Sequence, residues 1–243
     1  MKEAVEAVSN ADKIVVLTGA GMSVESGVAP FRGDDGLWNE YDPQEMASIT
    51  AFERNSERCW ELFKLQIKEC FEADPHEGHK ALVDLENFGL NSIITQNIDA
   101  LHQEAGSTEV LEIHGTLDEL VCPSCGRSEE TEERYEEILD GEIPRCECGS
   151  IMRPNVVLFG EPLPEGVMKK ARERTENCDL MMSIGTSAVV QPAASIPLMA
   201  KRSGAEVLEI NIESTSLTDN ITDYFLQGKA GEVLKEIRDA LRE

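Results

Sequence analysis

Four cysteines stand in two close pairs in the middle of the chain and have the chemistry of metal ligands. The first pair is Cys122 and Cys125, and the second is Cys146 and Cys148. Two such pairs typically bind zinc tetrahedrally through four thiolates. Four protein ligands leave no open position, so we predict a structural zinc site. The second pair is one residue shorter, which requires a tight turn, and Gly149 follows it.

A glycine-rich turn near the N-terminus suits a phosphate-bearing ligand. The apolar residues 14–17 predict a buried strand, and Gly19 and Gly21 follow them directly. Glycine allows a sharp turn and a close approach to a ligand, and the start of a following helix attracts a pyrophosphate. The third glycine, Gly27, comes late for a dinucleotide fingerprint, so a plain tight turn remains the alternative.

Polar side chains follow two further apolar stretches. Gln96, Asn97 and Asp99 come after residues 92–95, and His114 ends the next apolar stretch. In open α/β sheets, ligands bind at the carboxyl ends of the strands. These side chains are therefore candidates for a ligand site, in which His114 could act as a general base near neutral pH. The alternative is a purely structural histidine.

Strand and helix patterns alternate along the chain and predict an α/β fold with a parallel sheet. We expect strands at 14–17, 92–95, 110–113, 179–184 and 206–211, and helices at 2–11, 79–88, 164–175, 193–203 and 232–242. We expect a main domain formed by residues 1–39, 74–116 and 153–243, a small helical module at 40–73, and a zinc-binding insert at 117–152.

Several conspicuous side chains are expected to be structural. Cys59 and Cys70 fall on the apolar stripe of a helix and resemble small buried hydrophobes. His76 and His79 are expected to cap a helix or lie in the core. The turn-rich residues 34–43 predict a long mobile loop that could close over a ligand, unless its aromatic residues pack it down.

Composition limits the classes of function. Of the 243 residues, 47 are acidic and 22 basic, giving a net charge of -25 that disfavours direct nucleic-acid binding. The acidic surface could attract cationic polypeptides or serve solubility in a salty cytoplasm, and charge leaves both open. The chain has no apolar run long enough for a membrane and no signal-peptide pattern. Seven cysteines without an export signal indicate a reducing compartment, so we expect a cytoplasmic protein.

The chain resembles the sirtuins of archaeal and bacterial type, a family of NAD-dependent protein lysine deacetylases, over nearly its whole length. Six ordered blocks carry the resemblance: residues 19–33 from Gly-Ala-Gly-Met-Ser to Phe-Arg-Gly, 95–99 (Thr-Gln-Asn-Ile-Asp), His114-Gly115, the four cysteines, 156–161 (Val-Val-Leu-Phe-Gly-Glu) and 185–187 (Gly-Thr-Ser). Two departures are Val28-Ala29-Pro30, where the family usually has Ile-Pro-x, and the shorter second cysteine pair.

The resemblance implies a Rossmann-like parallel sheet with helices on both faces, plus the zinc-binding and helical modules. It implies NAD binding by Gly19, Ala20, Gly21, Ser23, Phe31, Arg32, Gln96, Asn97, Asp99, Gly185, Thr186, Ser187, Asn211 and Ala230. It further implies structural Zn²⁺ on the four cysteines, and an acetyl-lysine protein or peptide that pairs with an edge containing Val156, Val157 and Phe159.

In the chemistry that the resemblance implies, NAD is a co-substrate and the protein is an acyl-transferring enzyme. The acetyl oxygen attacks the ribose carbon as nicotinamide leaves, and His114 and Asn97 are the catalytic residues. His114 removes a proton from a ribose hydroxyl. Mono-ADP-ribosyl transfer and removal of other uncharged acyl groups are the alternatives. A dehydrogenase would need an acidic residue about twenty positions after the glycine turn, and a zinc-ribbon binding module would leave the other blocks unexplained.

The resemblance also predicts the choice of acyl group. Sirtuins that prefer succinyl-lysine carry a Tyr-x-x-Arg pair on a helix, and the matching positions here are Phe63 and Gln66. Neither side chain offers a positive charge to a carboxylate. We therefore expect uncharged acyl groups, with acetyl first, unless the two residues only pack the helix.

Overall fold

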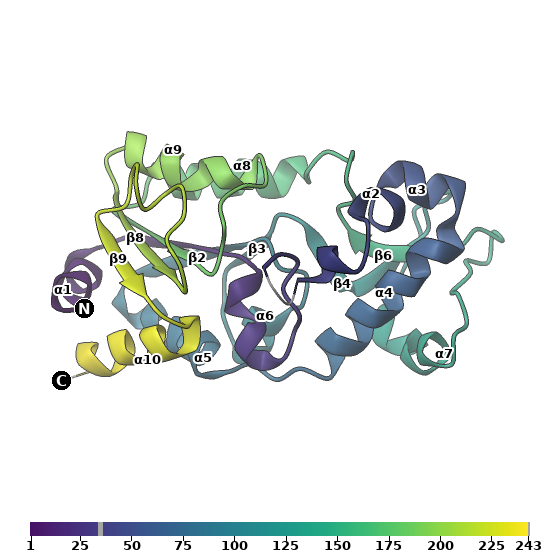
Figure 1. Cartoon of the computed structure of the whole chain (residues 1–243), viewed down its shortest axis with the longest axis horizontal. Helices are drawn as coiled ribbons and strands as arrows, with labels where there is room; N and C mark the ends of the chain where they lie inside the picture. The colour runs from purple at the N-terminus through teal and green to yellow at the C-terminus, as the bar shows by residue number, and fades with distance from the viewer. Residues whose placement is uncertain (34–35, 243) are drawn as a thin grey trace.

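The larger half of the molecule is a parallel sheet covered by helices on both faces (Figure 1). The computed structural model describes residues 1–33 and 36–242, and within them this sheet has six strands in the order β3-β2-β1-β7-β8-β9. The strands are β1 (Ile14–Thr18), β2 (Leu90–Thr95), β3 (Val110–Glu112), β7 (Leu180–Ile184), β8 (Glu206–Asn211) and β9 (Tyr224–Gln227). All pairings are parallel, which confirms the predicted α/β class.

The central strand β1 explains why this sheet needs helices on both faces. All five of its residues are buried, and alternate side chains belong to two different core clusters. Ile14 and Val16 pack on the face covered by α1 (Lys2–Asn10), α5 (Glu77–Leu85) and α10 (Ala230–Leu241). Val15 and Leu17 pack on the face covered by α8 (Glu165–Glu176) and α9 (Ile196–Arg202).

The smaller half combines a three-stranded antiparallel sheet with helices (Figure 1). Its strand order is β5-β4-β6, with β4 (Gly115–Val121) between β5 (Ser128–Glu130) and β6 (Arg153–Val156). The helices are α2 (Pro43–Met46), α3 (Ile49–Arg54), α4 (Ser56–Phe71) and α7 (Tyr135–Leu139). One apolar cluster joins α3 and α4 to this sheet, so the helical residues and the cysteine-rich residues share a core. The sheet extends at both ends beyond the expected insert of 117–152.

The structure differs from the expected elements at two places. A helix was expected to start directly after the glycine turn, but the chain instead forms two 3-10 turns, Ala20–Met22 and Val24–Ser26, and Gly27 ends the second with φ of 91°. Strand β9 was not predicted, because its residues lie at the sheet edge and are half-buried or exposed. The remaining short helices are α6 (Leu101–Ala105) and the 3-10 turns Leu37–Asn39, Glu86–Phe88, Thr131–Arg134 and Ala193–Ser195.

The cysteines and histidines that we expected to have structural roles lie in the core or cap a helix. Cys59 and Cys70 are buried in the core around α4. His76 caps α5 by accepting a hydrogen bond from Gly78 N, and His79 is fully buried. The expected loop includes residues 34–35, which lie outside the described residues, while Trp38 stacks on Phe31 with ring centroids 5.2 Å apart.

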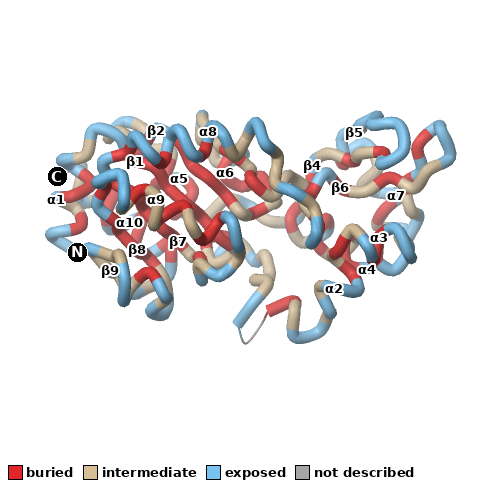
Figure 2. The backbone as a smooth tube through the Cα atoms, turned by 90° about the horizontal axis from the view of Figure 1, so that it is seen from above, coloured by how far each residue is buried: buried red, intermediate tan, exposed pale blue. Residues whose placement is uncertain are grey.

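The buried residues gather along the large sheet and at the core of the smaller half (Figure 2). Among the described residues, none of the helices is both long and apolar enough to span a membrane. The cysteines are all free.

Candidate active site

The carboxyl ends of β1, β2, β7 and β8 carry the polar and glycine residues that the sequence singled out. In the sheet, β1 lies between β2 and β7, so the chain order reverses at β1. A reversal of this kind opens a crevice at the strand ends where α/β proteins bind ligands. The turns after β1, β2 and β7 therefore meet on one edge of the large sheet, facing the smaller half (Figure 1).

The glycines of this crevice allow two backbone turns to pack against each other. A Cβ atom added at Gly19 would lie 2.7 Å from Thr186 Cβ, and one added at Gly21 would lie 2.8 Å from Gly185 Cα. Gly21 N donates a hydrogen bond to Gly185 O at 2.9 Å. We expected these glycines to permit close approach of a ligand, and the structure shows that they first permit close approach of the two strand-end turns.

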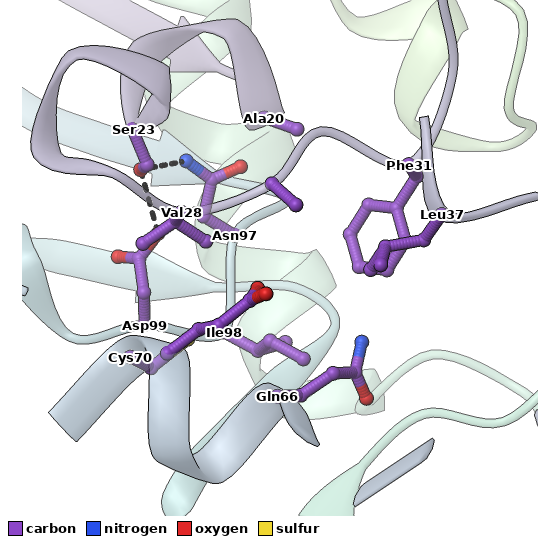
Figure 3. Close-up of a pocket in the computed structure, with 12 residues that line it drawn as sticks. Ala20, Ser23, Val28, Phe31, Leu37, Gln66, Cys70, Asn97, Ile98 and Asp99 are labelled. Carbon is purple, nitrogen blue, oxygen red and sulfur yellow. Dashed lines mark hydrogen bonds between the residues drawn. The ribbon is translucent and has the colours of Figure 1, made fainter. Parts of the chain in front are cut away.

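A buried network fixes Asn97 beside the glycine turn. Asn97 Nδ2 donates to Gly19 O at 3.1 Å and to Ser23 Oγ at 3.0 Å. Ser23 Oγ in turn donates to Asp99 Oδ2 at 2.6 Å, and Asp99 Oδ1 accepts from Leu101 N. Burial raises the pKa of Asp99, while the hydrogen bond from Ser23 opposes that rise. The amide nitrogen of Asn97 is thereby satisfied on the protein side (Figure 3).

Two further amides tie the strand ends together. Gln96 Nε2 donates to Thr18 O at 3.2 Å and to Thr186 Oγ1 at 3.0 Å, which links the ends of β2, β1 and β7. Asn211 Nδ2, at the end of β8, donates to Thr186 O at 3.2 Å. These bonds join the carboxyl ends of β1, β2, β7 and β8 into one fixed edge, which we call the strand-end rim.

His114 is held by both halves of the molecule. Its Nδ1–H donates to Gln96 O at 2.9 Å, and its backbone oxygen accepts from Val157 N at 2.8 Å. With the proton on Nδ1, the other ring nitrogen, Nε2, carries the lone pair that a general base needs. Burial lowers the pKa of His114, and the hydrogen bond to Gln96 partly opposes this shift. The imidazole is therefore neutral at pH 7.

A cavity lies between the glycine turn and helix α4 (Figure 3). One wall consists of residues that follow β1 and β2, and the other comes from α4 and from residues near Phe31. The lining residues are Ala20, Ser23, Val28, Ala29, Phe31, Leu37, Gln66, Glu69, Cys70, Asn97, Ile98 and Asp99. Of the two α4 positions considered for acyl choice, Gln66 lines this cavity. Phe63 instead packs in the core, with its ring 5.7 Å from Trp60.

The four cysteines come together as a ligand set that fits zinc. Their sulfur atoms all lie within 4.8 Å of one another, and two pairs, Cys122 with Cys148 and Cys125 with Cys146, are 3.5 Å apart. Zn–S bonds of about 2.3 Å in a tetrahedron place sulfur atoms roughly 3.8 Å apart. Gly149 supplies the expected tight turn, with φ of 90°. The thiolate set is complete, so the site suits a structural ion.

Some expected site residues are not part of the hydrogen-bonded network around Gln96 and Asn97. Arg32 and Ser187 are exposed, and among the described residues neither side chain makes a hydrogen bond or an ion pair. Ala230 is buried at the start of α10. Phe159 already pairs with the segment before α3, because its N donates to Ala47 O and its O accepts from Ile49 N.

Sequence reasoning did not assign four residues that line the cavity to the site: Leu37, Glu69, Cys70 and Ile98. Leu37 belongs to the loop that we read as mobile. Glu69 looks like an ordinary charged helix residue, although its position three residues after Gln66 places both on one helix face. This three-residue spacing could have indicated that Glu69 faces the same cavity as Gln66.

Comparisons with known proteins agree with this geometry. Residues 19–192 match the Sir2 family. The chain is 46% identical over 245 residues to NAD-dependent protein deacylase 2 of Archaeoglobus fulgidus, covering 100% of this chain and 96% of that one. A solved Sir2 homologue in complex with NAD has a TM-score of 0.92 and 43% identity, and the match covers 100% of this chain and 94% of that one. A Sir2 protein with a deacetylated p53 peptide and 3'-O-acetyl ADP-ribose has a TM-score of 0.93 and 33% identity, with 99% and 98% covered. Family match, identity and structural similarity all extend across both halves, and we conclude that this chain belongs to the Sir2 family.

Proposed function

We propose that this chain is an NAD-dependent protein lysine deacetylase, which transfers the acetyl group from lysine to ADP-ribose and releases nicotinamide. The observation that carries the proposal is the position of His114. Its Nδ1 is bonded to Gln96 at the nucleotide-binding edge, and its backbone is bonded to Val157 at the start of the expected peptide edge. One neutral imidazole therefore stands between the two substrates.

The rim of strand ends would hold NAD. Gly19, Ala20, Gly21 and Arg32 would face the phosphates and nicotinamide ribose, and Gln96, Asn97 and Asp99 the nicotinamide side. Gly185, Thr186, Ser187, Asn211 and Ala230 would face the adenosine half. Bound NAD supplies an activated ribose carbon that the acetyl oxygen attacks as the bond to nicotinamide breaks. The protein contributes fixed geometry, since Asn97 and Gln96 are already bonded to neighbouring turns.

His114 would act as the general base. Its lone pair on Nε2 accepts a proton from a ribose hydroxyl, and its Nδ1–H stabilises the resulting positive charge through the carbonyl of Gln96. Asn97 would orient the reacting groups, because its Nδ2 is anchored to Ser23 and Gly19. The Phe31 ring, which lines the cavity and stacks on Trp38, would help to exclude water from it.

The acetyl-lysine segment would bind beside β6, the edge strand of the smaller sheet. Position at the edge leaves one side of the strand without a neighbour in that sheet. We assign Val156, Val157 and Phe159 to this contact, and Phe159 would contribute its exposed side chain, because its backbone is already paired with Ala47 and Ile49. Zinc on the four cysteines would fix β4 and β6 relative to α4. A reducing compartment such as the cytoplasm fits seven free cysteines. Direct nucleic-acid binding is not expected at a net charge of -25.

Product analysis tests the function directly. The protein is incubated with NAD and an acetyl-lysine peptide, and the products are measured by mass spectrometry. We expect deacetylated peptide, free nicotinamide and acetylated ADP-ribose in equal amounts. Peptide that gains the mass of ADP-ribose would instead indicate mono-ADP-ribosyl transfer, and formation of NADH would indicate a dehydrogenase. Either result without deacetylation would contradict the proposal.

A further inference from the structure

An ion pair that is largely shielded from water joins the start of β6 to the end of the expected peptide edge. Arg153 donates from Nη2 to Glu161 Oε1 at 2.7 Å and from Nη1 to Glu161 Oε2 at 3.0 Å. Only 14% of the Arg153 side chain and 20% of the Glu161 side chain are exposed. A bidentate pair of guanidinium and carboxylate fixes the orientation of both side chains. The pair therefore holds residues 153 and 161 in one arrangement.

Both partners of this pair also bond the backbone between them. Arg153 Nη1 donates to Val156 O at 3.2 Å, and Glu161 Oε2 accepts from Leu158 N at 2.9 Å. A turn closes the segment, because Glu161 N donates to Leu158 O at 3.0 Å and Gly160 adopts φ of 93°. The two charged groups thus fix the backbone at Val156 and Leu158.

The two fixed residues flank the contact between this segment and His114. Val157, which lies between Val156 and Leu158 in the chain, donates from its N to His114 O at 2.8 Å. The ring of His114 is anchored separately, to Gln96 O on the strand-end rim. The ion pair therefore acts on the peptide side of His114, whereas Gln96 acts on the nucleotide side.

Packing and metal binding do not account for this pair. The smaller half already has an apolar cluster and a four-cysteine site, and neither includes Glu161 or the exposed Phe159 and Gly160. Removing two charges from water costs free energy, and a shielded ion pair adds little net stability compared with apolar side chains of similar volume. The contribution of the pair is therefore geometric, since it orients the backbone of residues 156–161.

We propose that Arg153 and Glu161 are positioning residues for the acyl-lysine substrate: their ion pair sets the backbone conformation of residues 156–161, so that loss of the pair weakens peptide binding and leaves NAD binding unchanged. The inference rests on the proposed deacetylase function and deepens it. Neither side chain has to touch the acetyl group in this role. Each acts through the backbone groups of Val156 and Leu158 that it bonds.

The test measures kcat and the KM values for an acetyl-lysine peptide and for NAD in variants that break the pair. Glu161→Gln keeps the shape of the side chain but removes its charge, and Arg153→Met removes the guanidinium. We expect the peptide KM to rise about tenfold in each, the order of one lost charge-assisted hydrogen bond, with the NAD KM unchanged. Arg153→Lys keeps the charge without the bidentate geometry and should lie between wild type and Arg153→Met. The double variant should cost little more than either single one.

The matched control is Arg134→Met. It removes another arginine of the smaller half that forms ion pairs, with Glu129 at 2.9 Å and with Glu137 at 2.8 Å, outside residues 153–161. This variant should keep kcat and both KM values. Hydrogen exchange of the free protein adds a readout that does not depend on turnover. In Glu161→Gln the amide of Leu158 should exchange faster, while the amides of β1 should keep their wild-type rates.

Other outcomes would overturn the inference. An unchanged peptide KM in the single variants contradicts it, and so does an equal rise in the KM values for peptide and NAD, which would indicate general damage. If Arg153→Met fails to fold, Glu161→Gln and Arg153→Lys decide the question. If the wild-type protein does not turn over acetyl peptide, the proposed function fails instead. Dissociation constants of the acetyl peptide then decide the inference, and equal constants for wild type and Glu161→Gln, or no binding to wild type, would refute it.

Discussion

The two halves of the molecule are stabilised in different ways. The larger half buries a central strand on both faces and completes two core clusters from its own sheet and helices. The smaller half has a sheet of short strands, one core cluster shared with α3 and α4, and a four-cysteine site. Small sheets bury too little apolar surface to be stable alone, so a metal ion compensates. The larger half should tolerate loss of the smaller one better than the reverse.

The candidate active site lies at the junction between the two halves. His114 takes its ring orientation from Gln96 of the larger half and its backbone position from Val157 of the smaller half. Damage in either half should therefore lower catalytic activity, whereas damage at the zinc site should leave the folding of the large sheet unchanged.

The largest expected effect is loss of the residue at this junction. His114→Ala should reduce deacetylation about a hundredfold to ten-thousandfold, because the proposed general base is removed. Since the side chain contributes one hydrogen bond to a backbone oxygen, zinc content and helix content should stay at wild-type values. The measurement is kcat on an acetyl peptide. Retention of near-normal turnover would remove His114 from the mechanism.

Removal of the zinc site should separate the two halves. Wild-type protein should contain about one zinc per chain. Cys122→Ser should abolish this zinc binding and lower deacetylation at least tenfold. Hydrogen exchange should accelerate in β4 and β6 but not in β1 and β7.

The matched control for the zinc experiment is Cys178→Ser, at a buried cysteine outside the cluster that donates to Thr175 O. It should keep both zinc and activity. Wild-type protein that is active without zinc, or equal acceleration of exchange in both halves, would contradict the distinction between the halves.

The walls of the cavity predict a strong preference against acidic acyl groups. The α4 wall offers an uncharged amide at Gln66 and a negative charge at Glu69, so a succinyl carboxylate would be desolvated without a counter-charge. We expect kcat/KM for a succinyl peptide to be at least about a hundredfold below that for the matched acetyl peptide. Equal efficiency would show that the acyl group does not reach this wall.

The pH profile probes the His114 environment. A general base must be neutral, and burial lowers the pKa of His114 below its usual 6.5. Activity should therefore be flat from pH 7 to 8 and fall about tenfold per pH unit only below a midpoint under 6.5. The midpoint is read from kcat/KM against pH. A midpoint above 6.5 would show that His114 is not desolvated as the structure indicates.

The smallest effect concerns backbone strain beside the network. Ala100, which follows Asp99, is buried with φ of 58°, a region that disfavours residues with a Cβ. Ala100→Gly should raise the free energy of unfolding by about 0.5–1 kcal/mol. Ala188, with φ of 51°, offers the same substitution at a second turn of the larger half. A drop in unfolding free energy in denaturant titration would contradict the expected relief of strain.

Much of the fold was predictable, because its signals are local. The apolar strands at Ile14, Ile93 and Met182 are continuous runs, and the helices carry regular apolar faces. Strand β9 was missed because an edge strand lacks that continuous burial. The helix expected after β1 was wrong for a tertiary reason, since the glycines there pack against Gly185 and Thr186.

Only some residues of the candidate site could be predicted from the sequence. Asn97, Asp99 and His114 could be found because they directly follow strands. The partnership of Ser23 with Asp99, and the cavity face of Glu69, depend on contacts between segments far apart in the chain. Sequence spacing alone does not encode those contacts.

The order of strands in the large sheet has a consequence for how the chain folds during synthesis. Ile14 of β1 pairs with Leu90 of β2 and with Leu180 of β7. The central strand therefore cannot gain its second neighbour until most of the chain has left the ribosome, and such long-range parallel pairing is slow. By that time all four cysteines have emerged, so zinc can assemble the smaller half before the larger sheet closes. With zinc bound, the smaller half can then form while the larger sheet still lacks β7, and the sheet with the larger core is completed last.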